Sequence, residues 1–314
     1  MSVAYVFPGQ GSQSVGMGKA LADAFPVARM VFADVDSALD QRLSALMFEG
    51  PDSDLTLTAN AQPALMAVSL AVVRVLEAEA GLDIGKAAFV AGHSLGEYSA
   101  LAAAGSLTVA DTARLLRIRG NAMQAAVPPG VGAMAALLGL DFDTAASVAA
   151  EAAAGEVCQA ANDNGGGQVV VSGTKSAVER AIEIAKTRGA KRAMLLPVSA
   201  PFHCTLMQPA AEAMAEALAQ VQVLPPRAPL MANVLAAPLT DPDAIRRSLV
   251  AQVTGTVRWR ECVGAMAAAG VTDFVELGSG KVLTGLLRRI VDTARGQAVG
   301  TPDDVAAYRT FIQA

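Results

Sequence analysis

One serine lies where a catalytic nucleophile is expected. Residues 92–96 read GHSLG, the G-x-S-x-G pattern in which small flanking residues tolerate a sharp strand-to-helix turn. A short apolar run, 87–91, precedes the turn, and helix-forming residues follow it. Ser94 would then lie at a helix N-terminus, where free N–H groups favour developing negative charge. The alternative is a serine that merely caps a helix between two loop glycines, but the flanking strand and helix favour the elbow.

A serine nucleophile needs a general base, and the sequence contains two histidines. His93 adjoins Ser94 on a tight turn, so the two side chains should point in different directions, and His93 is expected to line the pocket. His203 lies in VSAPFHC (198–204), an expected loop between a strand and a helix, where catalytic residues are common. A lone loop histidine is usually just a partly exposed side chain. Because an elbow serine requires a base, His203 is the favoured candidate.

Arg119 lies on an apolar stripe of the expected helix 109–126. Its neighbours three and four positions away on either side are leucine, leucine, alanine and methionine, and those offsets share one helix face. A buried guanidinium without an anion is unfavourable. One explanation is a carboxylate partner within the protein, or a side chain that extends to solvent along the stripe. The other is a substrate anion held by the planar, bidentate guanidinium.

The composition describes a compact globular protein. Of the 314 residues, 53% are hydrophobic and 17% are charged, and a chain of this length buries a large core. The formal net charge of −5 argues against nucleic acid as a general partner. The three cysteines, Cys158, Cys204 and Cys262, lack metal or redox spacing, so a reducing cytoplasm is expected. No secretory signal pattern is visible at the first residues, and the apolar run 61–76, which contains Arg74, is expected to be a buried helix too short to cross a bilayer.

Predicted strands and helices follow one another along the chain. Breaks at VPPGVG (127–132) and after Pro197 divide this pattern. We therefore expect a large domain of residues 1–127 and 198–314, with residues 128–197 inserted as a subdomain. The large domain is predicted to contain strands 3–7, 87–91 and 273–277 and helices 17–34, 36–46, 61–80, 109–126, 208–220, 242–251 and 281–295.

The insertion has its own order of elements. The pattern predicts strand 133–138, helix 142–153, strands 157–161 and 168–172, helix 175–188 and strand 192–197. This is the β-α-β-β-α-β order of a ferredoxin-like α+β unit. Its inner loop, 162–167, reads NDNGGG and is rich in turn-forming residues. The loop either faces the site or is an ordinary surface turn, and the pattern does not decide between them.

Six motifs together resemble the malonyl-CoA:acyl carrier protein transacylase family, in the order of that family and over essentially the whole chain. They are FPGQGSQ (7–13), GHSLGEYSA (92–100), RIRGNAMQ (117–124), NGGGQVVVSG (164–173), PVSAPFHC (197–204) and the segment 252–259. The resemblance implies an α/β-hydrolase-like large domain with a parallel sheet and an inserted ferredoxin-like subdomain. It also implies transfer of a malonyl group from malonyl-CoA to the phosphopantetheine thiol of acyl carrier protein, for fatty-acid synthesis.

The resemblance also implies roles for the reacting groups. Ser94 matches the family nucleophile and His203 its general base. Arg119 matches the arginine that binds the malonyl carboxylate. The main-chain carbonyl of Gln252 matches the group that orients the histidine, in place of the aspartate of a Ser-His-Asp triad.

Further positions are expected to shape the pocket. The backbone N–H groups of Gln10 and Leu95 match the family's oxyanion hole. His93, Asn162 and Phe202 are expected to line the pocket, and Phe202 is compatible with a small acyl group.

The implied reaction is a ping-pong exchange through a malonyl-Ser94 ester. It requires no cofactor and no metal, because one thioester is exchanged for another; neither nucleic acid nor a membrane is expected as a partner. Two other functions stay open. An α/β-hydrolase-type esterase or thioesterase would share the elbow but has no use for a buried Arg119. A non-catalytic carrier-protein-binding module would have no reason to keep both Ser94 and His203.

The acidic carrier protein should dock on a local basic surface of this acidic enzyme. Lys191 and Arg192, on the strand that leads to His203, are the first candidates. Arg288 and Arg289 are the second. The alternative is that these are solvated charges without a partner.

Overall fold

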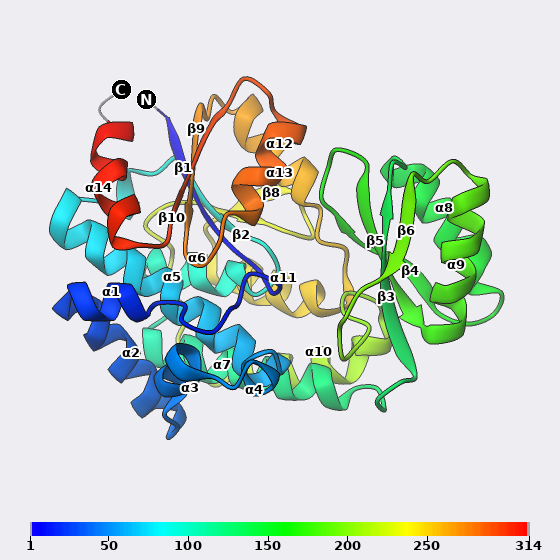
Figure 1. The fold of residues 1–314 in the computed structure, drawn as a ribbon, viewed down its shortest axis with the longest axis horizontal. Helices are drawn as coiled ribbons and strands as arrows, with labels where there is room; N and C mark the ends of the chain where they lie inside the picture. The colour runs from blue at the N-terminus through cyan, green and yellow to red at the C-terminus, as the bar shows by residue number, and fades with distance from the viewer. Residues whose placement is uncertain (1, 313–314) are drawn as a thin grey trace.

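The computed structural model describes residues 2–312 and contains two separate β-sheets surrounded by helices (Figure 1). The larger sheet lies with most of the helices in one part of the molecule. The smaller sheet lies at the other end of the longest axis with two helices of its own. The predicted α/β class is therefore confirmed.

The larger sheet is mostly parallel. Within the described residues its strands are β1 (Val3–Phe7), β2 (Phe89–Gly92), β7 (Leu230–Ala232), β8 (Ala237–Leu239), β9 (Asp273–Leu277) and β10 (Arg295–Val299). They lie in the order β10-β9-β1-β2-β7-β8, with an antiparallel pair formed by β7 and β8. Phe7 at the end of β1 lies opposite Gly92 at the end of β2. The loops that follow these two strands therefore start side by side, which is where ligands bind in open α/β sheets.

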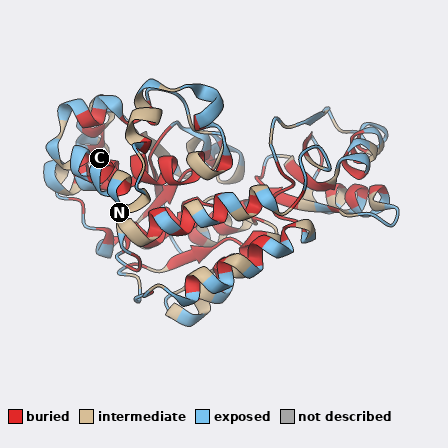
Figure 2. Ribbon diagram, turned by 90° about the horizontal axis from the view of Figure 1, so that it is seen from below, coloured by how far each residue is buried: buried red, intermediate tan, exposed pale blue. Residues whose placement is uncertain are grey.

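Helices cover both faces of the larger sheet. They are α1 (Lys19–Ala24), α2 (Pro26–Leu39), α3 (Leu43–Glu49), α4 (Asp52–Leu55), α5 (Thr58–Ala80), α6 (Gly96–Ala103), α7 (Val109–Ala125), α10 (Gln208–Ala219), α11 (Pro242–Thr254), α12 (Trp259–Ala268), α13 (Val282–Ile290) and α14 (Pro302–Phe311). Side chains of β1 alternate between the faces, as the pleat requires. Tyr5 and Phe7 belong to the core formed with α2, α5 and α7, whereas Ala4 and Val6 pack with α12 and α13. Buried residues accordingly follow the strands and the inner sides of the helices (Figure 2).

Helix α5 runs through the middle of the larger core. It is 23 residues long and, by length and composition alone, apolar enough to cross a membrane. However, 83% of its most apolar window is buried inside the protein, as in a core helix of a soluble domain. The expected buried helix is confirmed, but the expectation that its apolar stretch is too short for a bilayer is wrong.

The smaller sheet is antiparallel and is built by one continuous stretch of chain. Its elements are β3 (Gly132–Leu138), α8 (Phe142–Ala153), β4 (Cys158–Asp163), β5 (Gln168–Thr174), α9 (Lys175–Thr187) and β6 (Arg192–Leu195), and the strands lie in the order β4-β5-β3-β6. The predicted β-α-β-β-α-β order is confirmed. Helices α8 and α9 share a hydrophobic core with the sheet, which is separate from the cores of the larger sheet.

The prediction fails mainly after residue 220. The expected helix 281–295 ends at Ile290, and Arg295 begins strand β10, which pairs with β9. Strands β7 and β8 and helices α12 and α14 were not predicted. The first two strands have three residues each, too few to show an alternating pattern. Near the N-terminus, the expected helix 17–34 is interrupted at Phe25, where Pro26 starts a new helix.

Candidate active site

Ser94 lies on a strained turn between β2 and α6. Its φ of 54° is in the left-handed region, which non-glycine residues seldom occupy. A Cβ on Gly92 would lie 1.9 Å from the carbonyl carbon of Gly96, and a Cβ on Gly96 would lie 2.3 Å from the carbonyl oxygen of Phe7. Only glycine fits at either position, so the G-x-S-x-G spacing is a steric requirement of this turn. The predicted elbow geometry is present.

His203 contacts Ser94 and Gln252 through its two ring nitrogens. Its Nε2 lies 2.7 Å from Oγ of Ser94, and its Nδ1 lies 2.9 Å from the backbone oxygen of Gln252. A carbonyl oxygen only accepts, so Nδ1 carries the proton and Nε2 is free to accept the serine proton. His203 is buried in the loop between β6 and the short 3₁₀ helix η2 (Thr205–Met207), and its φ of 59° is also left-handed. Sequence reasoning placed both residues correctly, and the fold brings them together.

His203 is neutral at physiological pH. Burial, with the positive charge of Arg119 as the next cause, lowers the pKa of this imidazole to about 3. A histidine that is unprotonated throughout the neutral range is able to accept a proton from Ser94. The hydrogen bond to Gln252 opposes this shift, because it stabilises the imidazolium that forms when the proton is taken.

Arg119 is buried on α7 and points into the site, with 1% of its surface exposed. Its Nη1 donates to Oε1 of Gln62 at 2.9 Å, and its Nη2 donates to Oε1 of Gln252 at 2.9 Å and to Oγ of Ser94 at 3.0 Å. Arg119 makes no ion pair with any carboxylate between residues 2 and 312. No protein carboxylate of the described residues pairs with this charge, and the side chain does not extend to solvent; the guanidinium carbon lies 5.8 Å from the centroid of the Tyr98 ring.

The backbone N–H groups of Gln10 and Leu95 have no hydrogen-bond partner in the part of the chain that the structure describes. Gly9 packs directly on His93, since a Cβ there would lie 2.8 Å from the His93 carbonyl oxygen. The loop after β1 thus lies against the elbow. By contrast, the N–H of Ser94 itself donates to Oδ1 of Asn233 at 2.8 Å. The free amide of Leu95 directly follows Ser94, and that of Gln10 lies in the loop that packs on the elbow.

His93 and Phe202 adjoin Ser94 and His203 in the chain, whereas Asn162 differs from expectation. Nε2 of His93 lies 2.9 Å from Oδ1 of Asn164, and burial lowers the pKa of His93. Asn162 is not in a loop: it belongs to β4 and forms a bridge with Val257. The loop residue that contacts the elbow is therefore Asn164. Phe202 is buried in the main core immediately before His203.

Three buried polar residues in the site were missed by the sequence reasoning. Gln62 binds Arg119, Asn233 binds the elbow, and Glu97 binds both Gln252 and Asn233. Glu97 had a detectable signal, because it is the one charged residue of a helix, GEYSALAA, whose residues are all buried. Gln62 likewise interrupts an apolar run. Asn233 gave no signal, since it follows the unpredicted strand β7.

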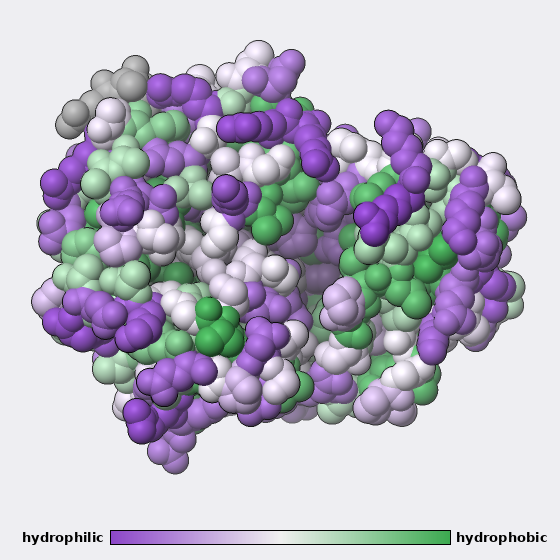
Figure 3. All heavy atoms as spheres, in the orientation of Figure 1, coloured by the Kyte–Doolittle hydropathy of each residue, from purple (hydrophilic) through white to green (hydrophobic). Residues whose placement is uncertain are grey.

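The four basic residues proposed for carrier binding are all exposed. Arg192 is the first residue of β6 and Lys191 immediately precedes it, and Arg288 and Arg289 lie in the last turn of α13. The surface in Figure 3 is hollowed between the larger part of the molecule and the small-sheet part.

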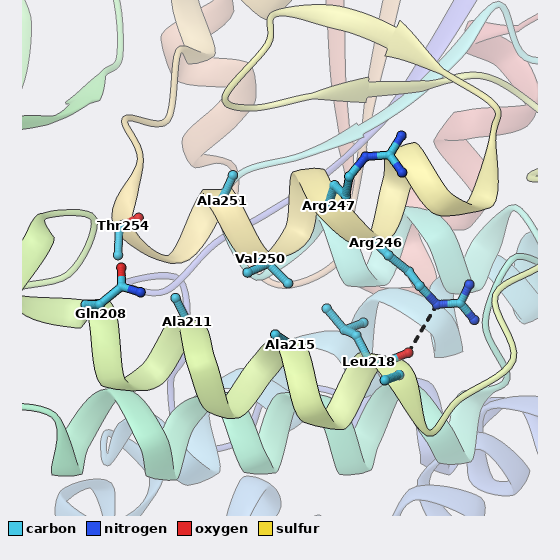
Figure 4. A pocket seen from close by; sticks show the side chains of 10 residues that line it. Gln208, Ala211, Ala215, Leu218, Arg246, Arg247, Val250, Ala251 and Thr254 are labelled. Carbon is cyan, nitrogen blue, oxygen red and sulfur yellow. Dashed lines mark hydrogen bonds between the residues drawn. The ribbon is translucent and has the colours of Figure 1, made fainter.

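A separate groove of about 460 Å³ lies between α10 and α11 (Figure 4). Its lining is mostly apolar, with Arg246 and Arg247 near one end and Gln208 and Thr254 at the other. Arg246 is held by the backbone oxygens of Leu218 and Val221. None of the reacting residues described above lines this groove.

Comparison with known proteins places the chain in a family. Residues 4–306 match the family described as acyl transferase domain. The chain is 48% identical over 305 residues to the malonyl CoA-acyl carrier protein transacylase of Escherichia coli K12, with 97% of each chain covered. The crystal structure of acyl-carrier-protein-S-malonyltransferase from Bartonella henselae matches with a TM-score of 0.97 and 57% identity over 100% of both chains.

A further solved structure contains a carrier protein. It is a malonyl-transacylase in complex with its type II PKS acyl-carrier protein, and it matches with a TM-score of 0.96 and 42% identity, covering 99% of this chain and 100% of that one. The fold, the motifs and the sequence identity agree, and the chain belongs to the malonyl CoA-acyl carrier protein transacylase family.

Proposed function

We propose that this protein transfers the malonyl group of malonyl-CoA to the phosphopantetheine thiol of acyl carrier protein, through an ester on Ser94. The observation that carries the proposal is the contact of Ser94 Oγ with both His203 and Arg119, at 2.7 Å and 3.0 Å. A nucleophile, a base and an unpaired guanidinium thus meet at one atom. The names of the relatives, malonyl transacylases and malonyltransferases, support the same activity.

In the first half-reaction, Oγ of Ser94 attacks the thioester carbonyl carbon while Nε2 of His203 takes the serine proton. The resulting oxyanion is held by the N–H groups of Gln10 and Leu95. The C–S bond then breaks, and His203 returns the proton to the departing coenzyme A thiolate. The malonyl group remains on Ser94 as an ester.

The second half-reaction runs the same steps in reverse. The carrier thiol gives its proton to His203, its sulfur attacks the ester carbonyl, and the C–O bond breaks. The proton then returns to Oγ of Ser94. One thioester replaces another, so the exchange requires no cofactor and no metal.

Arg119 selects the acyl group in this proposal. The malonyl carboxylate replaces Oγ of Ser94 as a partner of its guanidinium, while Gln62 keeps its bond to Nη1 and Gln252 its bond to Nη2. His93 and Phe202 border the pocket that receives the acyl group.

The two sheets belong to two structural units of the chain. We assign residues 1–127 and 198–314 to an α/β-hydrolase-like catalytic domain, supported by the elbow at the end of a parallel strand. Residues 128–197 form an inserted ferredoxin-like subdomain, supported by the order β4-β5-β3-β6. The enzyme would act in the cytoplasm.

Carrier protein would dock where the two parts meet. A Cβ on Gly139 would lie 2.8 Å from the side chain of Lys191, and a Cβ on Gly166 would lie 2.7 Å from that of Arg289. Gly167 in turn packs on Gly139, so the glycine loop lies between the two basic pairs. An acidic carrier bound across this loop would be attracted by both pairs.

Intact-protein mass spectrometry tests the proposal. Incubation with malonyl-CoA should give a stable malonyl adduct, and Ser94→Ala should abolish it. Addition of carrier protein bearing phosphopantetheine should remove the adduct and place malonyl on the carrier. An adduct that is rapidly hydrolysed would indicate an esterase, and carrier binding without an adduct would indicate a non-catalytic module.

A further inference from the structure

Glu97 is a buried carboxyl group that the reaction itself does not use. It lies on α6, three residues after Ser94, and none of its surface is exposed. Its Oε2 accepts a hydrogen bond from Nε2 of Gln252, and its Oε1 accepts from the backbone N–H of Asn233 at 3.2 Å. No basic side chain of residues 2–312 pairs with it. A buried acid without a counter-ion is unfavourable, so we looked for what it holds in place.

We propose that Glu97 is a positioning residue that fixes the side-chain amide of Gln252 and, through Gln252, both His203 and Arg119; the inference rests on the function proposed above. The Gln252 backbone oxygen accepts from His203, and its side-chain Oε1 accepts from Arg119, each at 2.9 Å. One residue therefore contacts both the base and the anion receptor.

Glu97 determines which way the Gln252 amide points. Nε2 of Gln252 donates to Glu97 and, at 2.9 Å, to the backbone oxygen of Ser94. If the amide were reversed, its oxygen would face the backbone oxygen of Ser94 and, when Glu97 is ionised, a carboxylate, and its NH₂ group would face the guanidinium of Arg119, which only donates. The carboxyl group of Glu97 thus keeps the amide oxygen directed at Arg119.

Gln252 also separates two opposite charges. A carboxylate in direct contact with Arg119 would neutralise the charge that attracts a malonyl carboxylate. Gln252 instead presents a neutral oxygen to the guanidinium and takes the contact with Glu97 on its other end. Burial raises the pKa of Glu97 to about 7, and the charge of Arg119 is among the smaller effects that oppose this rise. Arg119 is therefore held in place and remains free to bind a substrate anion.

The second bond of Glu97 supports the elbow. Asn233, whose N–H donates to Glu97, accepts from the N–H of Ser94 and donates to the backbone oxygen of Gly92, both at 2.8 Å. Glu97 thus stabilises the nucleophile, the base and the anion receptor from one position.

The test compares Glu97→Gln with a matched control, Glu276→Gln. Glu276 is equally buried, on β9, and accepts hydrogen bonds from Leu283 and Thr284 rather than from the site. Glutamine at 97 has a single acceptor oxygen for two donors, so the Gln252 amide loses its fixed orientation. For Glu97→Gln we expect kcat/KM for malonyl-CoA to fall about 10- to 100-fold, mainly in kcat, as for other supporting residues. The preference for malonyl-CoA over acetyl-CoA should also fall, while Glu276→Gln changes neither.

A double-mutant cycle decides whether Glu97 acts through Gln252. Gln252→Met keeps the backbone carbonyl and removes the amide, so it should lower the malonyl preference by itself, and Glu97→Gln should add little to it. The inference would be overturned if the two substitutions lowered the preference for malonyl-CoA additively, or if Glu97→Gln left that preference unchanged. If Glu97→Gln does not fold, the inference would be overturned by a Gln252→Met variant that keeps the preference for malonyl-CoA. Absence of any malonyl adduct in the unmodified protein would instead refute the proposed function.

Discussion

Replacement of Arg119 by alanine tests how the site distinguishes malonyl from acetyl. The guanidinium is buried, forms no ion pair with the described residues, and donates hydrogen bonds to Gln62, Gln252 and Ser94. A carboxylate roughly 4 Å from it, at an effective dielectric constant of about 20, gains about 4 kcal/mol, which is close to a thousandfold in rate. Acetyl offers no charge for this interaction and leaves the guanidinium unneutralised. Arg119→Ala should therefore lose about three orders of magnitude in malonyl kcat/KM, while acetyl transfer stays equal or rises.

The assay is competition between equal concentrations of malonyl-CoA and acetyl-CoA, with the two Ser94 adducts resolved by intact mass. Arg119→Lys should recover only part of the preference, because lysine keeps the charge but not the planar pair of donors. Arg117→Ala is the matched control: Arg117 is on the same helix and donates to Gln41, outside the site. The reasoning fails if the alanine variant keeps the preference of the unmodified enzyme, because another residue must then bind the carboxylate.

Three further predictions follow from the same geometry. His203→Ala should slow adduct formation by about 10²- to 10⁴-fold in stopped-flow or quenched-flow assays, the range for loss of a general base, whereas an unchanged rate would exclude His203 from that role. Charge reversal at Lys191 and Arg192 should raise KM for carrier protein and leave transfer to small thiols nearly unchanged; equal effects on both acceptors would contradict docking there. The pKa of Glu97 rises from 4.5 to about 7 on folding, so the folded state binds the proton more tightly and this stabilisation is lost as pH rises from 4.5 to 7. Because glutamine does not titrate, the free energy of unfolding of Glu97→Gln, measured with urea, should rise relative to that of the unmodified protein by about 3 kcal/mol between pH 4.5 and pH 8. A difference between the two proteins that stays constant with pH would contradict the raised pKa.

The sequence predicted where Ser94 and His203 lie in the fold because their signals are local. The elbow is specified by five consecutive residues, and two histidines left one plausible base. The inserted unit was predicted nearly residue by residue, and helix 142–153 agrees at both ends. Its N-cap, Asp141, accepts from the N–H of Thr144, a strong local start signal.

The supporting residues were not predicted because their contacts span long distances in sequence. Glu97 and Gln252 are separated by 155 positions, and Ser94 and Asn233 by 139. Nothing near Asn233 indicates that its side chain will bind the elbow. The same cause explains strands β7 and β10, since each forms because a neighbouring parallel strand is available and neither has a strong pattern of its own.

The charge of Arg119, which selects the substrate in the proposed mechanism, also acts on His203. Arg119 and His203 both contact Oγ of Ser94, and after burial the charge of Arg119 is the main cause of the low pKa of His203. In the proposed mechanism, a malonyl carboxylate bound to Arg119 cancels that charge, so the imidazole becomes more basic when the correct substrate is in place. Acetyl-CoA binds beside an uncompensated guanidinium and leaves His203 a weaker base. Discrimination by Arg119 should therefore appear in kcat as well as in KM, because the same carboxylate both binds the receptor and restores the proton acceptor.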